Sequence, residues 1–281
     1  MDIVISGLYV YPVKSCKGIS LSRADLDARG IRFDRAWMIT DTNGTFITQR
    51  EEPALSRIET AFQSDGLMLR APKMPDLHVS LRRRGAMVRT VRVWGDECHA
   101  YDEGDAAAAW LGRVTKRNCR LVRMADDHIR PVVGSDGSTA FSDGYPLLVI
   151  SRASLDDLNQ RLDEALPMDR FRPNIVVSGC GAFDEDTWEV ALSGSVLLRG
   201  MKPCERCVVT TTDQATGQRN SREPLHTLSR YRRIMKPDGK PGGVIFGVNV
   251  CHLTTGVLRL GDLITVRSRR EAHPFFNPTP A

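Results

Sequence analysis

Apolar residues along most of the chain occur in short runs or alternate with polar residues, which is the pattern of β-strands. Residues 88–93 alternate except where Thr90 meets Val91, and we expect a half-buried strand there. Residues 37–39 and 45–48 flank a turn at 41–44 and predict a hairpin. Short strands separated by turn residues favour a barrel or a sandwich over a doubly wound sheet.

The second half of the chain has the same β-rich pattern, with few helical segments. Its apolar runs predict strands at residues 174–178, 195–198, 208–212, 244–250 and 263–266. A loop-rich segment that contains Pro131, Gly134 and Gly137 precedes these runs. Such a change of texture marks a boundary between lobes.

Three segments predict helices. Residues 105–111 contain four consecutive alanines, and we expect the following Gly112 to end that helix. Ser154 and Asp157 resemble a capping pair for a second helix. This helix would carry one apolar face, made of Leu155, Leu158, Leu162 and Leu166. A third helix is predicted at residues 223–234.

These elements predict a β-rich α+β fold in two lobes with a few helices. We place the lobes at residues 1–122 and 123–270. Residues 271–281 carry three prolines and no periodicity, and we expect a flexible tail there. A chain of 281 residues can bury a sizeable core in either one large domain or two ordinary ones.

The composition, with 41% hydrophobic and 26% charged residues, is that of a soluble globular protein. No apolar run has the length of a membrane span, and the first residues lack the pattern of a signal peptide. We therefore expect a cytoplasmic protein without membrane association. Although the net charge is +5, the basic residues are scattered, with their densest run at residues 82–84. This scatter argues against a nucleic-acid partner.

Seven cysteines in a protein that is not exported are unlike a disulfide framework, because the cytosol keeps thiols reduced and the number is odd. Two of them, Cys204 and Cys207, are separated by two residues. A structural zinc site would need a second pair of ligands, and the other cysteines are isolated. A thioredoxin-like pair would open a helix, whereas a β-branched run follows Cys207.

A third interpretation of this motif is one reactive or metal-binding thiolate. Lys202 and Arg206 supply positive charge that favours the ionised form, and a soft metal would suit such a ligand. The competing interpretation is that both cysteines only fill space in the core. Pro203 and the flanking charges place the pair at the edge of a loop, which argues against simple packing.

Several basic and polar residues far apart in the sequence are candidates for binding phosphate. Lys14 and Ser15 lie in a predicted turn after a strand, and the guanidinium of Arg35 matches phosphate oxygens in a bidentate fashion. Arg172 and Asn174 precede a predicted strand. The alternatives are an ion pair between Arg35 and its neighbour Asp34, a surface position for Arg172, and simple capping by Asn174.

Taken together, these segments resemble the MOSC superfamily, in particular members with an N-terminal MOSC β-barrel: the mitochondrial amidoxime-reducing component and its bacterial YcbX-like relatives. The resemblance covers most of the chain, and its motifs are specific in order and wording. They are residues 11–18 (Tyr-Pro-Val-Lys-Ser-Cys-Lys-Gly), 34–37 (Asp-Arg-Ala-Trp), 49–53 (Gln-Arg-Glu-Glu-Pro), 141–143 (Phe-Ser-Asp), 171–175 (Phe-Arg-Pro-Asn-Ile), 204–207 (Cys-Glu-Arg-Cys) with 210–213 (Thr-Thr-Thr-Asp) and Gly217, and 247–249 (Gly-Val-Asn).

The resemblance implies a molybdenum–molybdopterin cofactor, that is, molybdenum bound to one pyranopterin, with or without a nucleotide. It implies that Cys207 is the protein ligand of the metal and the catalytic residue, while Cys204 lies beside it without binding the metal. It also implies a set of residues that contact the phosphate and pterin: Lys14, Ser15, Arg35, Ser142, Arg172, Asn174 and Arg206.

The implied reaction is the reduction of N-hydroxylated compounds such as hydroxylamines, amidoximes and N-hydroxylated bases. Because the chain ends soon after Val266 without a ferredoxin domain, we expect a separate electron donor: a ferredoxin, a flavin reductase or a cytochrome b5-like protein. The alternative is a carrier of the molybdenum cofactor or of sulfur, because MOSC domains also resemble part of the molybdenum-cofactor sulfurases.

Overall fold

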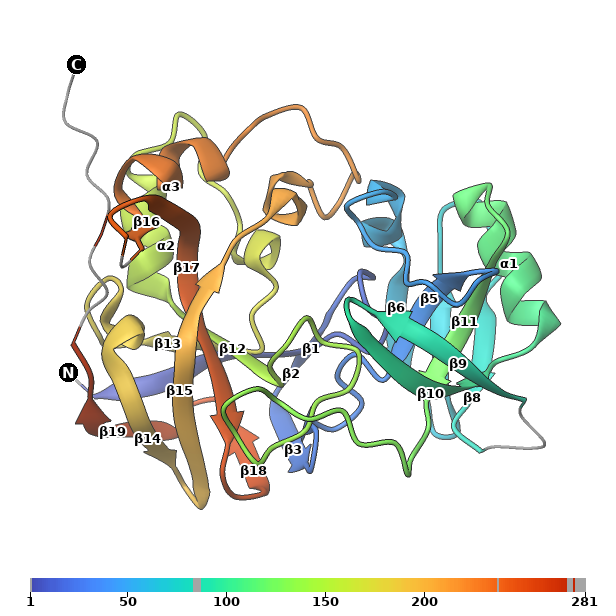
Figure 1. Ribbon diagram of the computed structural model, residues 1–281, viewed down its shortest axis with the longest axis horizontal. Helices are drawn as coiled ribbons and strands as arrows, with labels where there is room; N and C mark the ends of the chain where they lie inside the picture. The colour runs from blue at the N-terminus through green and yellow to red at the C-terminus, as the bar shows by residue number, and fades with distance from the viewer. Residues whose placement is uncertain (1, 83–86, 237, 272–274, 276–281) are drawn as a thin grey trace.

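The computed structural model describes residues 2–82, 87–236, 238–271 and 275. Two β-rich lobes lie side by side (Figure 1), which confirms the predicted β-rich α+β class. The predicted tail at 271–281 lies outside the described residues except for Glu271 and Phe275. In the described part of the chain, no helix is both long enough and apolar enough to cross a membrane.

A closed barrel forms one lobe, with a ring of seven strands among the described residues. Its order is β12-β13-β1-β19-β14-β15-β17, and β17 pairs with β12 to close the ring. In chain order the seven are β1 (Ile3–Val10), β12 (Leu147–Ser151), β13 (Ile175–Ser178), β14 (Trp188–Ser193), β15 (Val196–Glu205), β17 (Pro241–His252) and β19 (Leu263–Arg269). Short strands β2 (Ile19–Leu21) and β16 (Arg233–Met235) extend this sheet.

Alternate residues of the barrel strands serve two cores, because successive side chains of a strand point to opposite faces. Val149 and Val248 belong to the larger cluster, together with Ile5 and Leu8 of β1. Their neighbours on the other face pack beneath the helices α2 (Arg152–Asn159) and α3 (Leu225–Tyr231). That second cluster consists of Leu148, Ile150, Leu158, Phe171, Leu228, Val244 and Phe246.

The first strands of the chain pair with its last ones. β1 runs antiparallel to β19, and a separate three-stranded sheet joins β3 (Arg23–Asp27) to β4 (Gly30–Ile31) and β18 (Gly256–Arg259). The division at residues 122 and 123 remains a prediction about folding units. In space, the strands before residue 32 lie with the barrel lobe.

The second lobe is a half-barrel made of two sheets and one helix. One sheet has the order β5-β11-β10-β9 and the other β6-β7-β8. The helix α1 (Asp105–Thr115) covers them and contributes Trp110 and Leu111 to their core. The strands are β5 (Trp37–Asp41), β6 (Glu59–Phe62), β7 (Gly66–Arg70), β8 (Leu77–Ser80), β9 (Val88–Val93), β10 (Asp96–Asp102) and β11 (Cys119–Met124).

Most predicted strands are confirmed. The strand predicted at 88–93 is β9. The strands predicted at 174–178, 244–250 and 263–266 correspond to β13, β17 and β19, and the one predicted at 195–198 corresponds to β15, which begins at Val196 and continues to Glu205. The predicted hairpin is present only in part: β5 forms its first arm, and the second arm is limited to bridges such as Thr40 with Phe46.

The strand predicted at 208–212 is wrong, because Val208–Thr211 forms a 3₁₀ turn, η4. Threonine hydroxyls bond back to backbone carbonyls there. Thr210 Oγ1 donates to the carbonyl oxygen of Cys207 at 2.9 Å, and Thr211 Oγ1 to that of Val208 at 2.8 Å. Such local bonds compete with strand pairing and outweigh the β-propensity of the run.

The presence of helices in the three predicted segments is confirmed, but the residues at which they begin and end differ from the prediction. α1 continues through Gly112 and ends at Thr115, and the capping residue Lys116 adopts a left-handed conformation. Ser151, and not the predicted Ser154 with Asp157, caps α2, since its hydroxyl accepts from the amide of Ser154 at 3.0 Å. α2 stops before two of its predicted leucines, and α3 is shorter than predicted because Ile234 belongs to β16. The remaining 3₁₀ turns are η1 (Pro53–Arg57), η2 (Met168–Phe171) and η3 (Asp184–Thr187).

Candidate cofactor site between the lobes

A cavity between the lobes brings together all eight residues that the sequence singled out. Its atom-free space, open mouth included, is about 810 Å³. The eight come from turns and strand ends of both lobes: Lys14, Ser15, Arg35, Ser142, Arg172, Asn174, Arg206 and Cys207. Their assembly supports their choice as candidates, while their roles toward a cofactor stay a prediction.

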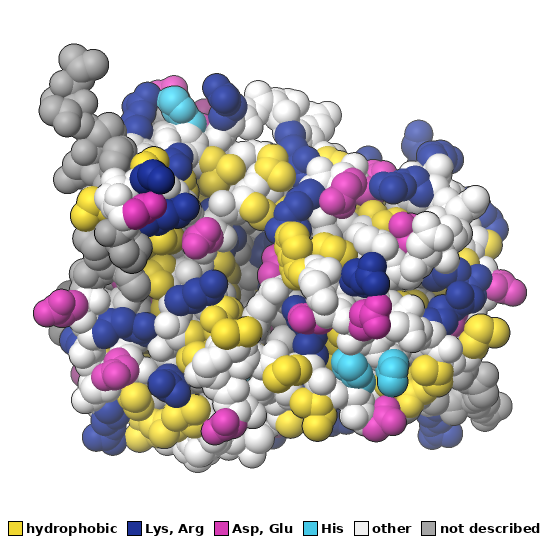
Figure 2. Space-filling view, viewed as in Figure 1, with side chains coloured by type: hydrophobic (Ala, Val, Ile, Leu, Met, Phe, Trp, Pro, Cys, Tyr) yellow, Lys and Arg dark blue, Asp and Glu magenta, His cyan; other side chains and the backbone are white. Residues whose placement is uncertain are grey.

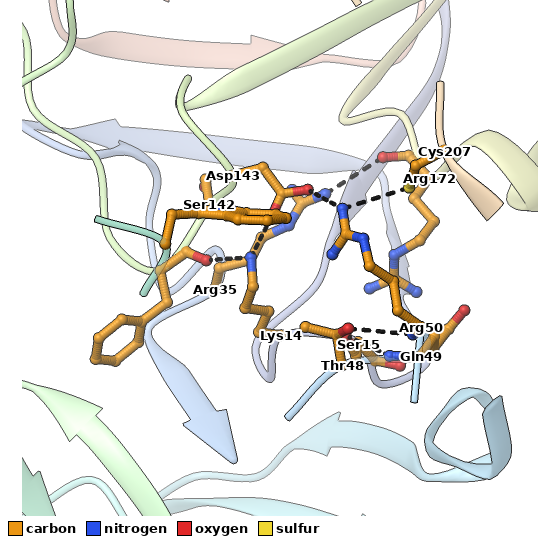
Figure 3. Close-up of polar contacts among 12 residues, drawn as sticks. Lys14, Ser15, Arg35, Thr48, Gln49, Arg50, Ser142, Asp143, Arg172 and Cys207 are labelled. Carbon is orange, nitrogen blue, oxygen red and sulfur yellow. Dashed lines mark hydrogen bonds and ion pairs between the residues drawn. The ribbon is translucent and has the colours of Figure 1, made fainter. Parts of the chain in front are cut away.

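Cys207 lies between the end of β15 and the start of η4. Its Sγ atom accepts a hydrogen bond from Arg50 Nη2 at 3.4 Å (Figure 3). Cys204 has a different partner, because its Sγ atom lies 3.0 Å from Arg206 Nη1. The two thiols therefore occupy distinct environments, as expected if only one binds a metal.

Arg50 crosses from the half-barrel lobe to the thiol and was not selected from the sequence. Its guanidinium lies 4.5 Å from the ring centroid of Trp94, and its Nη2 atom lies 3.6 Å from Asp143 Oδ2. The motif at residues 49–53 contained Arg50, yet it gave no indication of which side chain faces the cavity. Asp143 was missed for the same reason, although it follows the predicted Ser142.

Lys14 points into the cavity from the turn after β1. Its Nζ atom donates to the carbonyl oxygen of Phe141 at 2.8 Å and also to Asp143 (Figure 3). Burial lowers the pKa of Lys14, and Asp143 opposes that shift. Desolvation raises the pKa of Asp143, but the neighbouring Lys14 and Arg50 outweigh it and leave this pKa below its ordinary value.

Backbone conformation directs three of the site residues. Ser15 has φ 71°, Arg35 has φ 46° and Arg172 has φ 55°, in the left-handed region that non-glycine residues rarely adopt. Gln49 holds the Ser15 turn, since its Nε2 donates to the carbonyl oxygen of Ser15 at 2.7 Å and its backbone amide donates to Ser15 Oγ at 3.2 Å. Strained conformations of this kind persist where surrounding contacts fix them, and they cluster at functional sites.

The ion pair between Arg35 and Asp34, proposed as an alternative, is present. Arg35 Nη1 lies 2.5 Å from Asp34 Oδ2 and 3.0 Å from Asn174 Oδ1. Asn174 is buried, and its amide nitrogen donates to Asp34 and to the carbonyl oxygen of Tyr9. Asn174 therefore orients Arg35 and Asp34 rather than offering a free group to a ligand. Arg35 remains open to the cavity along part of its guanidinium.

Arg172 provides the test of whether an anion fits here. Its guanidinium lies 4.3 Å from the ring centroid of Tyr11, and the guanidinium of Arg35 lies 4.4 Å from the same centroid. Its Nη2 atom is buried and has no hydrogen-bond partner among the described atoms. A buried donor without an acceptor is costly, and an anionic oxygen in the cavity would satisfy it.

The charge of the cavity favours the same kind of ligand. Its basic side chains are Lys14, Arg35, Arg50, Arg172 and Arg206, against the acidic Asp143 and Glu205. Among the described residues, no three histidine, cysteine, aspartate or glutamate side chains form a group that could hold a metal ion. A metal at Cys207 would therefore need its remaining ligands from a bound organic group. The donor set fits an anionic, metal-carrying cofactor.

Two family models match the chain: the MOSC N-terminal beta barrel domain over residues 2–118 and the MOSC domain over residues 136–265. The chain belongs to the MOSC family. Three mitochondrial amidoxime-reducing components are similar to this MOSC protein over 274 residues and 92% of its length. Component 2 of Bos taurus is 36% identical (81% of that protein covered), component 1 of Mus musculus 38% (80%) and component 2 of Homo sapiens 35% (82%).

Proposed function

We propose that this MOSC protein is a molybdenum-cofactor-dependent reductase of N-hydroxylated compounds. The observation that carries the proposal is the meeting of Cys207, with Cys204 beside it, and five basic side chains in a single cavity. The names of its relatives, which are amidoxime-reducing components, supply the substrate class.

The proposed reaction converts R–NH–OH, two electrons and two protons into R–NH₂ and water. Molybdenum, held by Cys207 and one pyranopterin, supplies the two-electron redox couple when it is bound. We propose that the Lys14, Ser15 and Arg172 side chains hold the phosphate of the cofactor and that Arg206 and Ser142 contact its pterin. Arg35 adds positive charge to the contact with the phosphate, and Asn174 holds the side chain of Arg35 in place.

Arg50 has two roles in this proposal. It neutralises the thiolate of Cys207, because charge-assisted hydrogen bonds to an anion are stronger than neutral ones. It also links Cys207 to Asp143, and its guanidinium lies against the ring of Trp94. The described cavity lining contains no histidine, and Asp143 with its lowered pKa is ionised at neutral pH. We therefore propose that the two protons come from solvent at the cavity mouth.

The test is metal and pterin analysis of wild type beside Cys207→Ala, together with turnover of benzamidoxime driven by reduced methyl viologen. We expect stoichiometric molybdenum and turnover in wild type, and turnover at least a thousandfold lower in Cys207→Ala, because the metal loses its protein ligand. Molybdenum in wild type without turnover of any N-hydroxylated compound would favour the carrier function instead.

A further inference from the structure

A second depression lies directly behind the cofactor cavity, and the proposed function does not use it. We call it the arginine hollow and define it by Arg206, Val208, Arg219, Arg222, His226 and Arg233. Its atom-free space, open mouth included, is about 1030 Å³. Basic side chains gather around α3 at the upper left of Figure 2, beside hydrophobic ones.

The wall between the two spaces is the single turn η4. Val209 and Thr210 line the cofactor cavity, whereas Val208 and Thr211 line the hollow. Arg206 lines both. The residues on either side of Cys207 in the sequence therefore face the hollow, and a partner seated there lies one turn of chain from the thiol.

The charge of the hollow is unbalanced. Its described lining contains no aspartate or glutamate. Arg219 is held by neutral acceptors, the hydroxyl of Thr212 at 2.8 Å and the carbonyl oxygen of Arg50 at 2.9 Å. By contrast, Arg161 and Arg232 on the same lobe pair with the carboxylates of Asp157 and Asp186. No carboxylate of the described lining therefore offsets the positive charge of the hollow, which favours an external anion.

An apolar residue lies among these charges. Val208 is 40% exposed, and Leu225 lines the hollow from the start of α3. An apolar centre with a charged rim is the composition of a protein-binding surface. The described lining has no phenylalanine, tyrosine or tryptophan, the large rings on which bases usually stack, so single-stranded nucleic acid is disfavoured.

We infer that the arginine hollow docks an acidic one-electron carrier protein of the haem or iron–sulfur type. This inference rests on the proposed function, which requires electrons from outside. Two reduced carriers each give up one electron, and together with two protons these convert R–NH–OH into R–NH₂ and water. Complementary charge steers such short-lived encounters, whose interfaces are small.

The test uses the holoenzyme, a soluble cytochrome b5 haem domain of net negative charge, and two matched charge reversals. The first, Arg222→Glu with Arg230→Glu, changes two exposed residues, one in the hollow and one on its rim, where Arg230 bonds to His226 at 2.9 Å. The control, Arg113→Glu with Arg117→Glu, changes two exposed residues of a separate basic depression beside α1. Both lower the net charge equally.

At low salt we expect the first pair to raise the dissociation constant of the haem domain about tenfold and the control pair to change it less than about twofold. Added salt should remove the difference, because it screens charges beyond about 10 Å. Benzamidoxime turnover driven by methyl viologen should be unchanged in both. Turnover driven by the haem domain should fall only in the first.

Each contrary result has a separate meaning. Equal weakening by both pairs, or by neither, overturns the assignment of the hollow. Selective loss of binding to vesicles of anionic lipid or to duplex DNA, with carrier binding intact, assigns the hollow to another partner and also overturns it. Absence of viologen-driven turnover in wild type contradicts the proposed function, while the binding measurement still decides the surface. If the reversals fail to fold, Arg222→Gln with Arg230→Gln should give a smaller loss in the same direction.

Discussion

Asp102 and Asp143 each lie between two basic side chains, and their surroundings differ in two respects. Asp102 accepts from Arg120 at 2.6 Å and 2.9 Å, and also from Arg89, and its side chain is 3% exposed. Asp143 pairs with Lys14 and Arg50, but its side chain is 59% exposed and its partners also face Cys207.

The difference separates a structural ion cluster from a binding one. The Asp102 cluster joins the adjacent strands β9, β10 and β11 and adds Asp105 as a second carboxylate, so that its charges balance. At the Asp143 cluster the cations outnumber the carboxylates that line the cavity. An excess of buried positive charge destabilises the fold unless a ligand offsets it. Such an excess therefore indicates a site that binds an anion.

Arg120→Met should produce the largest loss of stability. Asp102 would keep only Arg89 and the backbone amide of Gly104 as donors, and breaking a buried ion pair by removing one partner costs about 3 kcal/mol. The free energy of unfolding at pH 7, measured with urea, should fall by about that amount while the pterin content of the folded protein is unchanged. A loss below about 1 kcal/mol would contradict a structural role for this cluster.

Lys14→Met should have the opposite pattern of effects from Arg120→Met, with a large loss of cofactor binding and a small loss of stability. We expect its affinity for pterin to fall about thirtyfold, or about 2 kcal/mol, because a charge-assisted contact to phosphate is lost. The cofactor-free variant should unfold within about 1 kcal/mol of wild type, since burial already disfavours the charged amine and Asp143 stays in contact with water. Pterin fluorescence after oxidation measures the content. Full pterin content in this variant would remove Lys14 from the site.

The Asp102 cluster should make the free energy of unfolding fall as the pH is lowered into the acid range. Burial raises the pKa of Asp102, but hydrogen bonds from Arg120, Gly104 and Arg89 outweigh it and leave this pKa lowered. Below the unfolded pKa of about 3.9 the unfolded chain binds the proton more tightly, so this stabilisation is lost as the pH falls. Between pH 6 and pH 3 wild type should therefore lose roughly 1 kcal/mol more than Asp102→Asn. Parallel urea titrations with equal losses would contradict it.

Cys204→Ala should have the smallest effect. Its thiol contacts Arg206 and does not face Arg50 as Cys207 does. We expect molybdenum content to be unchanged and benzamidoxime turnover to stay within about threefold of wild type, because one thiolate is sufficient for the metal. Losses equal to those of Cys207→Ala, at equal cofactor content, would show that both thiols are required.

The sequence predicted the fold class and the membership of the cavity because both depend on local pattern and on motifs. The alternation at residues 88–93 and the motif at 204–207 can both be recognised without knowing which residues lie nearby in space. Arg50 could not be chosen in this way, because its importance comes from crossing to a thiol on the other lobe. The turn η4 was missed since threonine hydroxyls, and not side-chain shape, decide its backbone.

The pairing of β1 with β19 has a consequence for synthesis of the protein. A ribosome releases Ile3 long before Ile264, its partner on the adjacent strand. Contacts so distant in sequence form slowly and only after most of the chain is available. Lys14 follows β1 directly, and Cys207 belongs to the late part of the chain. The complete site therefore forms only once β19 has been synthesised, and incorporation of any cofactor must follow that step.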